Sequence, residues 1–255
     1  MYFKVKLAEL VIGVECRYET TKWFCKDYLV EDEDKDIEVK IEDRDIENER
    51  QTSLDVEQEK EGTEKDISVK KTEYRNEYLE TLALLRKISE RLPEYNCFLM
   101  HGAVAAADGK GYMFTAPSGT GKSTHINLWK KYYANVTIVN GDKPFIRIKD
   151  SGVWAYGTPW AGKEGWQENV TVPLRAICIL GRGEDNRIEK MSLIQALPYI
   201  MRQIHYTDDP DMAGRILELL DQMMADVPIY WLECDMSREA AECSYKELVM
   251  GCLKK

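Results

Sequence analysis

The chain has 255 residues, a formal net charge of −10, 44% hydrophobic residues and 10% aromatic residues, which is typical of a globular protein with a sizeable core. Its length suits one large domain, or a domain of ordinary size with an attachment. No uninterrupted apolar run approaches the roughly 18 residues of a membrane span, and the first residues lack a signal-peptide pattern. We therefore expect a cytoplasmic protein that does not bind membranes.

The negative charge is concentrated in one segment. Between Glu31 and Asp66 there are 17 acidic and 6 basic residues, so the rest of the chain is close to neutral. A solvated connector is the favoured interpretation, and a docking surface for a basic partner is the alternative. No basic stripe indicates nucleic-acid binding. The seven cysteines contain no C-x-x-C pair, and they indicate neither a disulfide framework nor a zinc site.

The N-terminal part is predicted to be rich in β-structure. Residues 4–19 and 22–30 are rich in β-branched and aromatic side chains, and residues 37–41 alternate apolar with charged ones. We predict a β-rich region over residues 1–42. Residues 43–73 have no persistent apolar period, so they are predicted to be an acidic linker, either mobile or a solvated helix.

Residues 74–255 alternate strand and helix patterns, and we predict an α/β domain there. A helix is expected within residues 74–92. Hairpins are expected around Asp108-Gly109 and around residues 150–152, because these are strong turn sequences. Further on, strands over 173–180 and 228–234, helices near 192–205 and 211–226, and a final helix from Ser237 are predicted.

Residues 116–125, APSGTGKSTH, match the phosphate-binding pattern G-x-x-x-x-G-K-[ST], with Ala116 in place of the first glycine. Glycines let backbone N–H groups converge on phosphate oxygens, and the following helix offers its positive N-terminal end. A chance match is disfavoured, because a predicted strand precedes the loop and a predicted helix follows it. Lys122 is suited to the β- and γ-phosphates, and the Ser123 hydroxyl to Mg²⁺. The residues predicted to bind the nucleotide are Ser118, Gly119, Thr120, Gly121, Lys122, Ser123 and Thr124.

Asp142 is the candidate carboxylate for this site. It follows the predicted strand VTIV and lies twenty residues after Lys122. Beside the loop it could bind Mg²⁺, directly or through water, or accept the proton of an attacking hydroxyl. The alternative is a turn residue, because Gly-Asp-Lys-Pro is good turn chemistry. We favour the functional role.

Three other side chains have more than one interpretation. His101 precedes Gly102 in the predicted first strand of the hairpin, where it is either a core residue or part of the site. Lys163 lies in GTPWAGKEGWQEN, which either closes over phosphate or substrate or is an ordinary connection with packed tryptophans. His125 is expected on the surface of the helix.

The order of these motifs resembles that of a known family. HGAVAAADGKGYMFTAPSGTGKSTHINLW, VNGDKPFI and YGTPWAGK are similar to the HPr kinase/phosphorylase-related kinases, which share a P-loop fold with phosphoenolpyruvate carboxykinases. The similarity covers about residues 74–255, and its motifs lie between residues 101 and 163. It implies a P-loop α/β core of this type, with a mixed sheet and flanking helices.

The resemblance implies ATP- and Mg²⁺-dependent transfer of phosphate to a serine-type hydroxyl of a small molecule, peptide or protein. It places His101 near the acid, Lys122 and Lys163 on developing charge, and Ser123 with Asp142 on the metal. Relatives commonly assemble, so a homo-oligomer is one option. The family commonly has paired aspartates where this chain has Gly141 and Asp142, and the carboxyl-terminal signature of true HPr kinases is not recognisable.

Rival functions remain at this point. A nucleotide-binding regulator or adaptor without phosphotransfer is the first alternative, and Gly141 and the acidic segment both favour it. A phosphoenolpyruvate carboxykinase-like enzyme is the second, although no cluster of His, Lys and Asp suggests its additional metal site. A general ATPase is disfavoured, because no acidic residue ends a distant strand.

Overall fold

A computed structural model describes residues 1–63 and 74–251, with side chains omitted for residues 55–63. Its contacts divide the chain into two compact units, Met1–Ile88 and Ser89–Lys255. The division falls inside one helix, α3 (Asn76–Arg91). The predicted partition into 1–42, 43–73 and 74–255 stays a prediction, and residues 64–73 of that linker lie outside the described residues.

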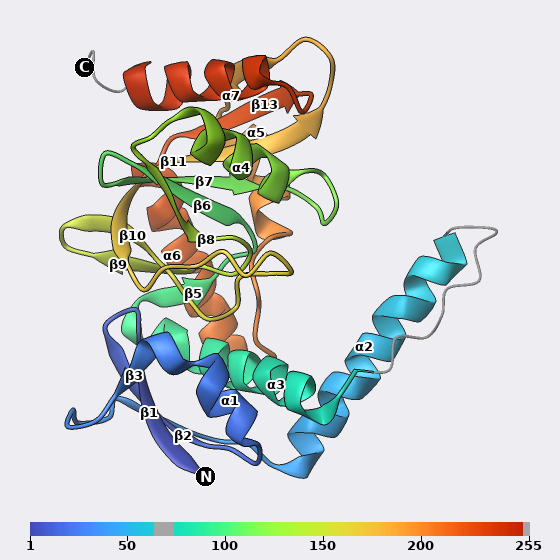
Figure 1. Cartoon of the computed structure of the whole chain (residues 1–255), viewed down its shortest axis with the longest axis vertical. Coiled ribbons are helices and arrows are strands. Elements are labelled where there is room, and N and C mark those ends of the chain that lie inside the picture. Colours follow the sequence, from blue (N-terminus) through green and yellow to red (C-terminus); the bar gives the residue numbers. More distant parts are fainter. Residues whose placement is uncertain (64–73, 252–255) are drawn as a thin grey trace. The chain divides into compact units, whose positions relative to one another are not determined.

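The first unit contains a four-stranded sheet in the order β3-β1-β2-β4 (Figure 1). The antiparallel β1–β2 hairpin turns through Ala8 and Glu9, whose φ angles of 50° and 65° suit the right-handed twist of a two-residue turn. β2 pairs in parallel with β4. The bounds are β1 (Tyr2–Leu7), β2 (Leu10–Glu15), α1 (Glu19–Phe24), β3 (Leu29–Val30), β4 (Ile37–Lys40) and α2 (Asp43–Thr63).

The strand predicted over residues 22–30 is wrong for most of its length. Helix α1 covers its first residues, a 3₁₀ turn follows, and only β3 is extended. The cause is a contact between segments far apart in the sequence. Glu80 of α3 is fully buried and accepts hydrogen bonds from Arg17 N–H (2.6 Å) and Tyr18 N–H (3.1 Å) at the start of α1, and from the Thr21 hydroxyl. A carboxylate there satisfies the two N–H groups that directly precede the helix, and it complements the helix dipole.

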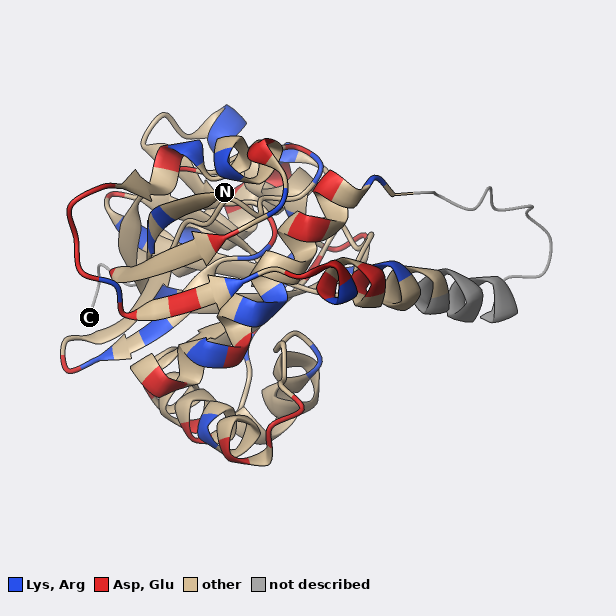
Figure 2. Ribbon diagram, turned by 90° about the horizontal axis from the view of Figure 1, so that it is seen from below, with Lys and Arg blue, Asp and Glu red and all other residues tan. Residues whose placement is uncertain are grey.

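The linker over residues 43–73 was predicted to be either mobile or a solvated helix. Where the structure describes it, over residues 43–63, it is helix α2. Figure 2 shows acidic and basic bands along the described part of α2. The Asp45 carboxylate is buried and lies 2.7 Å from Lys87 Nζ, and Glu49 lies 2.7 Å from Arg86 Nε. Ion pairs with α3 therefore hold the first turns of α2, which explains why no apolar period marks it.

The second unit is built on a nine-stranded mixed sheet. Its main path is β5-β9-β10-β11-β7-β6-β8, and β13 pairs with both β11 and β12. The strands are β5 (Cys97–Leu99), β6 (Ala103–Ala107), β7 (Lys110–Thr115), β8 (Val136–Asn140), β9 (Phe145–Lys149), β10 (Gly152–Tyr156), β11 (Thr171–Arg182), β12 (Arg187–Lys190) and β13 (Ile229–Cys234). The helices are α4 (Lys122–Tyr132), α5 (Leu193–Met201), α6 (Pro210–Asp226) and α7 (Arg238–Tyr245).

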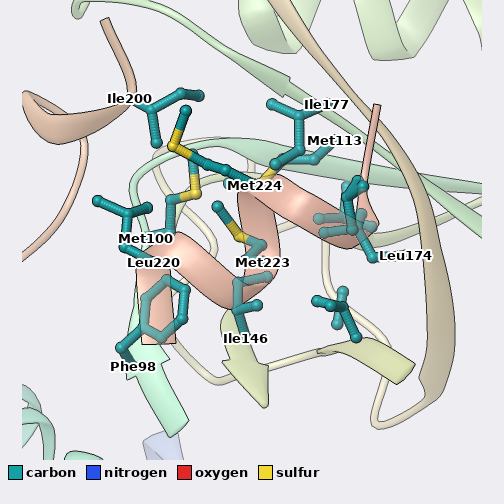
Figure 3. Packing of buried hydrophobic residues seen from close by; sticks show 14 of the residues in the cluster. Phe98, Met100, Met113, Ile146, Leu174, Ile177, Ile200, Leu220, Met223 and Met224 are labelled. Atoms are coloured by element: carbon teal, nitrogen blue, oxygen red, sulfur yellow. The ribbon is translucent and has the colours of Figure 1, made fainter. Parts of the chain in front are cut away.

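Helices cover both faces of this sheet, because its strands bury alternate side chains on opposite sides. In β11, Ile177 and Ile179 join a core with α5 and α6, whereas Cys178 and Leu180 join a core with α4 and α7. Figure 3 shows the first core, where Met223 and Met224 of α6 pack among strand residues. The predicted α/β class is therefore confirmed at the level of a mixed sheet with flanking helices.

Both predicted hairpins are confirmed. Asp108 and Gly109 have φ angles of 50° and 72° between β6 and β7, and Gly152 has a φ of 110° at the start of β10. The predicted strand through His101 is interrupted, because β5 pairs with β9 whereas β6 pairs with β7 and β8. Strand β12 was not predicted. None of the described helices is both long and apolar enough to cross a membrane.

Candidate active site at the carboxyl ends of β7 and β8

The candidate residues lie where β7 and β8 end. Both strands pair antiparallel with β6, which lies between them, so both end at the edge where β6 begins. β7 leads into residues 116–121, which we name the glycine-rich loop, and α4 follows it. β8 leads into Gly141 and Asp142. The topology therefore brings the loop and the candidate carboxylate to one edge of the sheet.

The glycine-rich loop depends on two glycine conformations. Gly119 and Gly121 have φ angles of 79° and 121°, and a Cβ at either position would meet no atom within 4 Å. These positions require glycine for its backbone freedom rather than for space. Ala116 is buried at the end of the strand.

Lys122 is held beneath the loop in a nearly buried position. Its Nζ donates to the carbonyl oxygens of Ala116 (2.9 Å) and Pro117 (3.3 Å). Burial lowers the pKa of Lys122, and the charge of Asp142 opposes that shift. Thr120 also donates to the Pro117 oxygen, from its N–H at 3.3 Å and its hydroxyl at 2.9 Å. Three donors therefore converge on one carbonyl oxygen, and a phosphate oxygen could accept from the same groups.

Asp142 faces His101 across the start of β6. Asp142 Oδ1 lies 3.3 Å from His101 Nε2, and His101 Nδ1 lies 2.9 Å from Gln203 Oε1. Both ring nitrogens are thus engaged, which sets the orientation of the imidazole. Two further hydrogen bonds lie around this pair: the hydroxyl of Thr115, the residue before the loop, donates to the His101 carbonyl (2.7 Å), and Gly102 N–H donates to the Asp142 carbonyl (2.9 Å).

The environment of Asp142 favours its ionised form. Burial would raise its pKa, but the hydrogen bond from His101 and the charges of Lys143, His101 and Lys122 outweigh burial and lower it. Lys143 Nζ lies 3.6 Å from Asp142 Oδ2. An ionised, partly buried carboxylate can bind a cation or accept a proton from a hydroxyl.

Asn140, rather than Asp142, makes the turn. Its side-chain oxygen accepts hydrogen bonds from the N–H groups of Asp142 (2.8 Å) and Lys143 (2.7 Å), and its amide donates to Thr158. The alternative interpretation of Asp142 as the turn residue is therefore wrong, because Asn140 makes the turn. Asn140 could have been found from sequence, because Asn-Gly-Asp is turn chemistry.

The loop containing Lys163 packs against the end of β8. A Cβ on Gly141 would lie 2.7 Å from the Ala161 carbonyl oxygen, and a Cβ on Gly162 would lie 3.2 Å from Asp142 Cβ. Trp160 is buried and stacks on Phe145, as expected for a packed connection, whereas the side chain of Lys163 is exposed. This loop therefore forms a wall beside Asp142, and any part that Lys163 has in binding phosphate stays a prediction.

Gly141→Ala should destabilise the protein, because the Ala161 carbonyl occupies the space that a side chain needs. We expect the free energy of unfolding to fall by about 1–3 kcal/mol, the usual range for overpacking, in urea denaturation. Gly214→Ala is the matched control: Gly214 is exposed within α6 with open space at its Cβ, and there alanine should add up to about 1 kcal/mol. Equal effects at both positions would contradict close packing at Gly141.

His125 is not on the helix surface, contrary to expectation. It is 2% exposed, and its Nε2 lies 2.9 Å from Ser244 Oγ of α7, which also accepts from Trp129 Nε1. Ser244 donates to a carbonyl of its own helix, so Nε2 carries the proton that His125 donates. Burial lowers the pKa of His125 to about 4. A neutral imidazole therefore anchors the first turn of α4 to α7.

The edge thus brings together the glycine-rich loop, Lys122, His101 and Asp142, and it places Ser123 in the first turn of α4. Asn140, Gln203 and Arg182 were not predicted to contribute to this edge. Gln203 reaches His101 from the segment after α5, and Arg182 Nη2 donates to the Gly119 carbonyl at 2.6 Å. Neighbouring residues do not mark Gln203 or Arg182 as part of the site, because each contacts a segment that is distant in sequence.

The fold and this edge define an α/β protein in which a strand, a glycine-rich loop and a helix meet a carboxylate–imidazole pair. Residues 67–242, more than half of the chain, match the family described as SynChlorMet cassette protein ScmC, and the chain belongs to this family. No curated protein matches the chain in sequence.

Among solved structures, the Hpr(Ser) kinase/phosphatase from Coxiella burnetii is similar over 61% of this chain and 97% of that chain, with 9% identity and a TM-score of 0.37. A similarity this distant carries no functional argument, so the resemblance to that family rests on the motifs of the sequence.

Proposed function

We propose that the protein is a kinase that transfers the γ-phosphate of ATP to a serine-type hydroxyl of a small molecule, peptide or protein. The observation that carries the proposal is the placement of an ionised Asp142, held by His101, at the same sheet edge as the glycine-rich loop. Phosphoryl transfer needs little covalent chemistry from the protein, so positioning and charge are the chief requirements.

The loop would hold the phosphates through backbone N–H groups and the positive end of α4. Its predicted binding residues are those from Ser118 to Thr124. Lys122 would exchange its carbonyl contacts for β- and γ-phosphate oxygens and oppose the charge that develops there. Lys163, exposed on the neighbouring loop, is the second proposed cation.

Asp142 and Ser123 would hold Mg²⁺. Among the described residues, no group of three or more His, Cys, Asp or Glu could hold a metal. Mg²⁺ commonly uses one or two protein ligands together with substrate phosphates and water, so one carboxylate and one hydroxyl meet its needs. When bound, Mg²⁺ neutralises charge on the β- and γ-phosphates.

Asp142 would also orient the acceptor. In the proposed transfer, the acceptor oxygen bonds to the γ-phosphorus, the bond to the β–γ bridging oxygen breaks, and ADP leaves. The proton of the acceptor passes to a carboxylate oxygen of Asp142. His101 lies 3.3 Å from that carboxylate and would keep it in position without contacting the reacting atoms.

A nucleotide-binding regulator is the second candidate, and Gly141 is the observation that favours it. One carboxylate lies here where related kinases commonly have two, and the carbonyl of Ala161 occupies the space for a side chain at position 141. Such a protein would bind nucleotide and transfer nothing.

The experiment that separates the two incubates the protein with γ-labelled ATP, Mg²⁺ and a panel of serine, threonine, peptides and proteins. We expect label on one hydroxyl-bearing acceptor and stoichiometric ADP. Nucleotide binding measured by calorimetry, without label on any acceptor and without ADP formation, would establish the regulator instead.

A further inference from the structure

Helix α5 exposes an apolar face. Six large apolar side chains between residues 193 and 206 are at least 36% exposed, and that of Ile194 is 86% exposed. The helix itself contains no charged residue. Because residues four apart lie on the same side of a helix, the most exposed of these side chains form one stripe along it. We name this stripe the α5 seam: Leu193, Ile194, Leu197 and Met201. A contiguous exposed apolar patch of this kind marks an interaction site.

The rest of α5 is firmly held by the protein. Its first turn has a capping box, in which Gln195 N–H donates to the Ser192 hydroxyl (3.4 Å) and Ser192 N–H donates to Gln195 Oε1 (3.0 Å). Ile200 is fully buried in the core that Figure 3 shows. The ring of Tyr199 packs on that of Trp231 in β13, with 5.4 Å between the ring centroids. The seam is therefore the solvent-facing side of a well-anchored helix.

The segment after α5 leads directly to the candidate active site. It pairs antiparallel with residues 99–101: His101 N–H donates to the Gln203 carbonyl (2.7 Å), and His205 N–H donates to the Leu99 carbonyl (3.2 Å). The side chain of Gln203 also contacts the ring of His101, which in turn faces Asp142. All of these residues belong to the second unit. The seam thus ends two residues before a residue that touches the carboxylate–imidazole pair.

Arg202 places a cation between the seam and the site. The antiparallel register puts it opposite Gly102, whose N–H donates to the Asp142 carbonyl. The side chain of Arg202 is exposed, and it forms no ion pair within the part of the chain that the structure describes. A guanidinium without a carboxylate partner can bind a carboxylate that a ligand brings.

The size of the seam suits a short segment rather than a folded partner. Four side chains form it, whereas a stable protein–protein interface takes roughly 20–30 residues a side, so a second copy docked on the seam alone would not form a stable dimer. The seam extends for about 12 Å, at 1.5 Å per residue of helix. An extended peptide covers that length with about four residues, and its alternate side chains point to one side. Two apolar side chains at alternate positions would therefore fill the seam.

We propose that the phosphate acceptor is a polypeptide that docks on the α5 seam through apolar side chains at alternate positions. An acidic side chain of the same polypeptide would pair with Arg202, between these apolar residues and the hydroxyl at Asp142. The inference rests on the proposed phosphotransfer. It selects one of the acceptor classes named there, and it gives α5 the role of holding that acceptor so that its hydroxyl is presented to Asp142.

The test offers the full chain a positional library of serine peptides together with γ-labelled ATP and Mg²⁺. Each flanking position is fixed in turn as one amino acid. Leucine, isoleucine or methionine at two alternate positions should raise labelling about threefold or more above the library mean, and so should an acidic residue between them and the serine. Label on peptides without a preference for apolar residues would overturn the docking site and leave the kinase function intact. Label on free serine but on no peptide would do the same.

Substitutions on the exposed surface test the same site without disturbing the core. Ile194→Ser together with Leu197→Ser should raise the KM for the preferred peptide about tenfold and leave kcat and the Kd for ATP unchanged, because a docking contact is the same in the ground state and the transition state. Leu217→Ser is the matched control, since Leu217 is 46% exposed on α6, and it should leave the KM unchanged. Arg202→Gln should remove only the preference for an acidic residue, whereas Arg175→Gln, at an exposed position of β11, should remove none.

Three further results would reject the site. An unchanged KM in the folded double variant would overturn docking on the seam. A dimer of the wild-type protein in sedimentation that the double variant dissociates would assign the seam to a second copy instead. No label on any acceptor and no ADP would reject the proposed phosphotransfer itself, and the acceptor site with it.

Discussion

Lys122→Ala is expected to abolish ATP turnover and to weaken ATP binding by about 100-fold or more, since a desolvated charge pair is worth several kcal/mol. The ammonium group is nearly buried under the glycine-rich loop, where it donates to the carbonyl oxygens of Ala116 and Pro117 and interacts with the charge of Asp142. On binding it would exchange these carbonyl contacts for phosphate oxygens. Calorimetric titration with ATP and an assay of ADP formation measure the two effects.

Lys130→Ala is the control for this prediction. Lys130 is exposed in the last turn of the same helix, so its removal changes the charge of the protein equally but leaves the loop intact. It should keep wild-type affinity and turnover. Thermal unfolding of both variants separates loss of function from loss of fold. Full activity of folded Lys122→Ala would remove the loop from the mechanism.

Asp142→Asn is expected to lower the rate of phosphoryl transfer by about 10²–10⁴-fold, the contribution typical of a positioned acid or base. The substitution keeps the shape of the side chain but removes the charge that His101, Lys143 and Lys122 stabilise. Binding of ATP without Mg²⁺ should change little, whereas the Mg²⁺ concentration needed for half-maximal activity should rise. Steady-state kinetics at several Mg²⁺ concentrations measure both.

Asp150→Asn is the matched control, since Asp150 is exposed in the turn between β9 and β10. It should leave the rate and the Mg²⁺ dependence unchanged. If Asp142→Asn kept its rate within about threefold of wild type, Asp142 could not be the base. If the variant reached a normal rate only at high Mg²⁺, Asp142 would have a role in metal binding only.

Gly141 lies where the kinases that the sequence resembles commonly have the first of two aspartates. The carbonyl oxygens of Ala161 and Trp166 lie 2.7 Å and 3.4 Å from the place that a Cβ at position 141 would take. An aspartate at position 141 would therefore require the loop beside Asp142 to move. The close packing of this loop therefore depends on the lack of a side chain at position 141.

Several features could be predicted from the sequence because their causes are local. The strand–loop–helix order around Lys122 follows from glycines with positive φ between two periodic segments, and the β6–β7 hairpin follows from Asp108-Gly109. The alternation of strand and helix patterns over residues 74–255 likewise indicated the α/β class. Asp142 was found because it lies two residues beyond the end of β8.

Only the tertiary structure decided the features that depend on partners far along the chain. α1 forms where a strand was predicted because Glu80, some 60 residues on, accepts hydrogen bonds from the Arg17 and Tyr18 N–H groups that directly precede the helix. His125 is buried because α7 covers it, and Gln203 reaches His101 across more than 100 residues. Turn and helix signals are set by neighbouring residues, whereas burial, charge pairing and the walls of a cavity arise only when distant segments pack together.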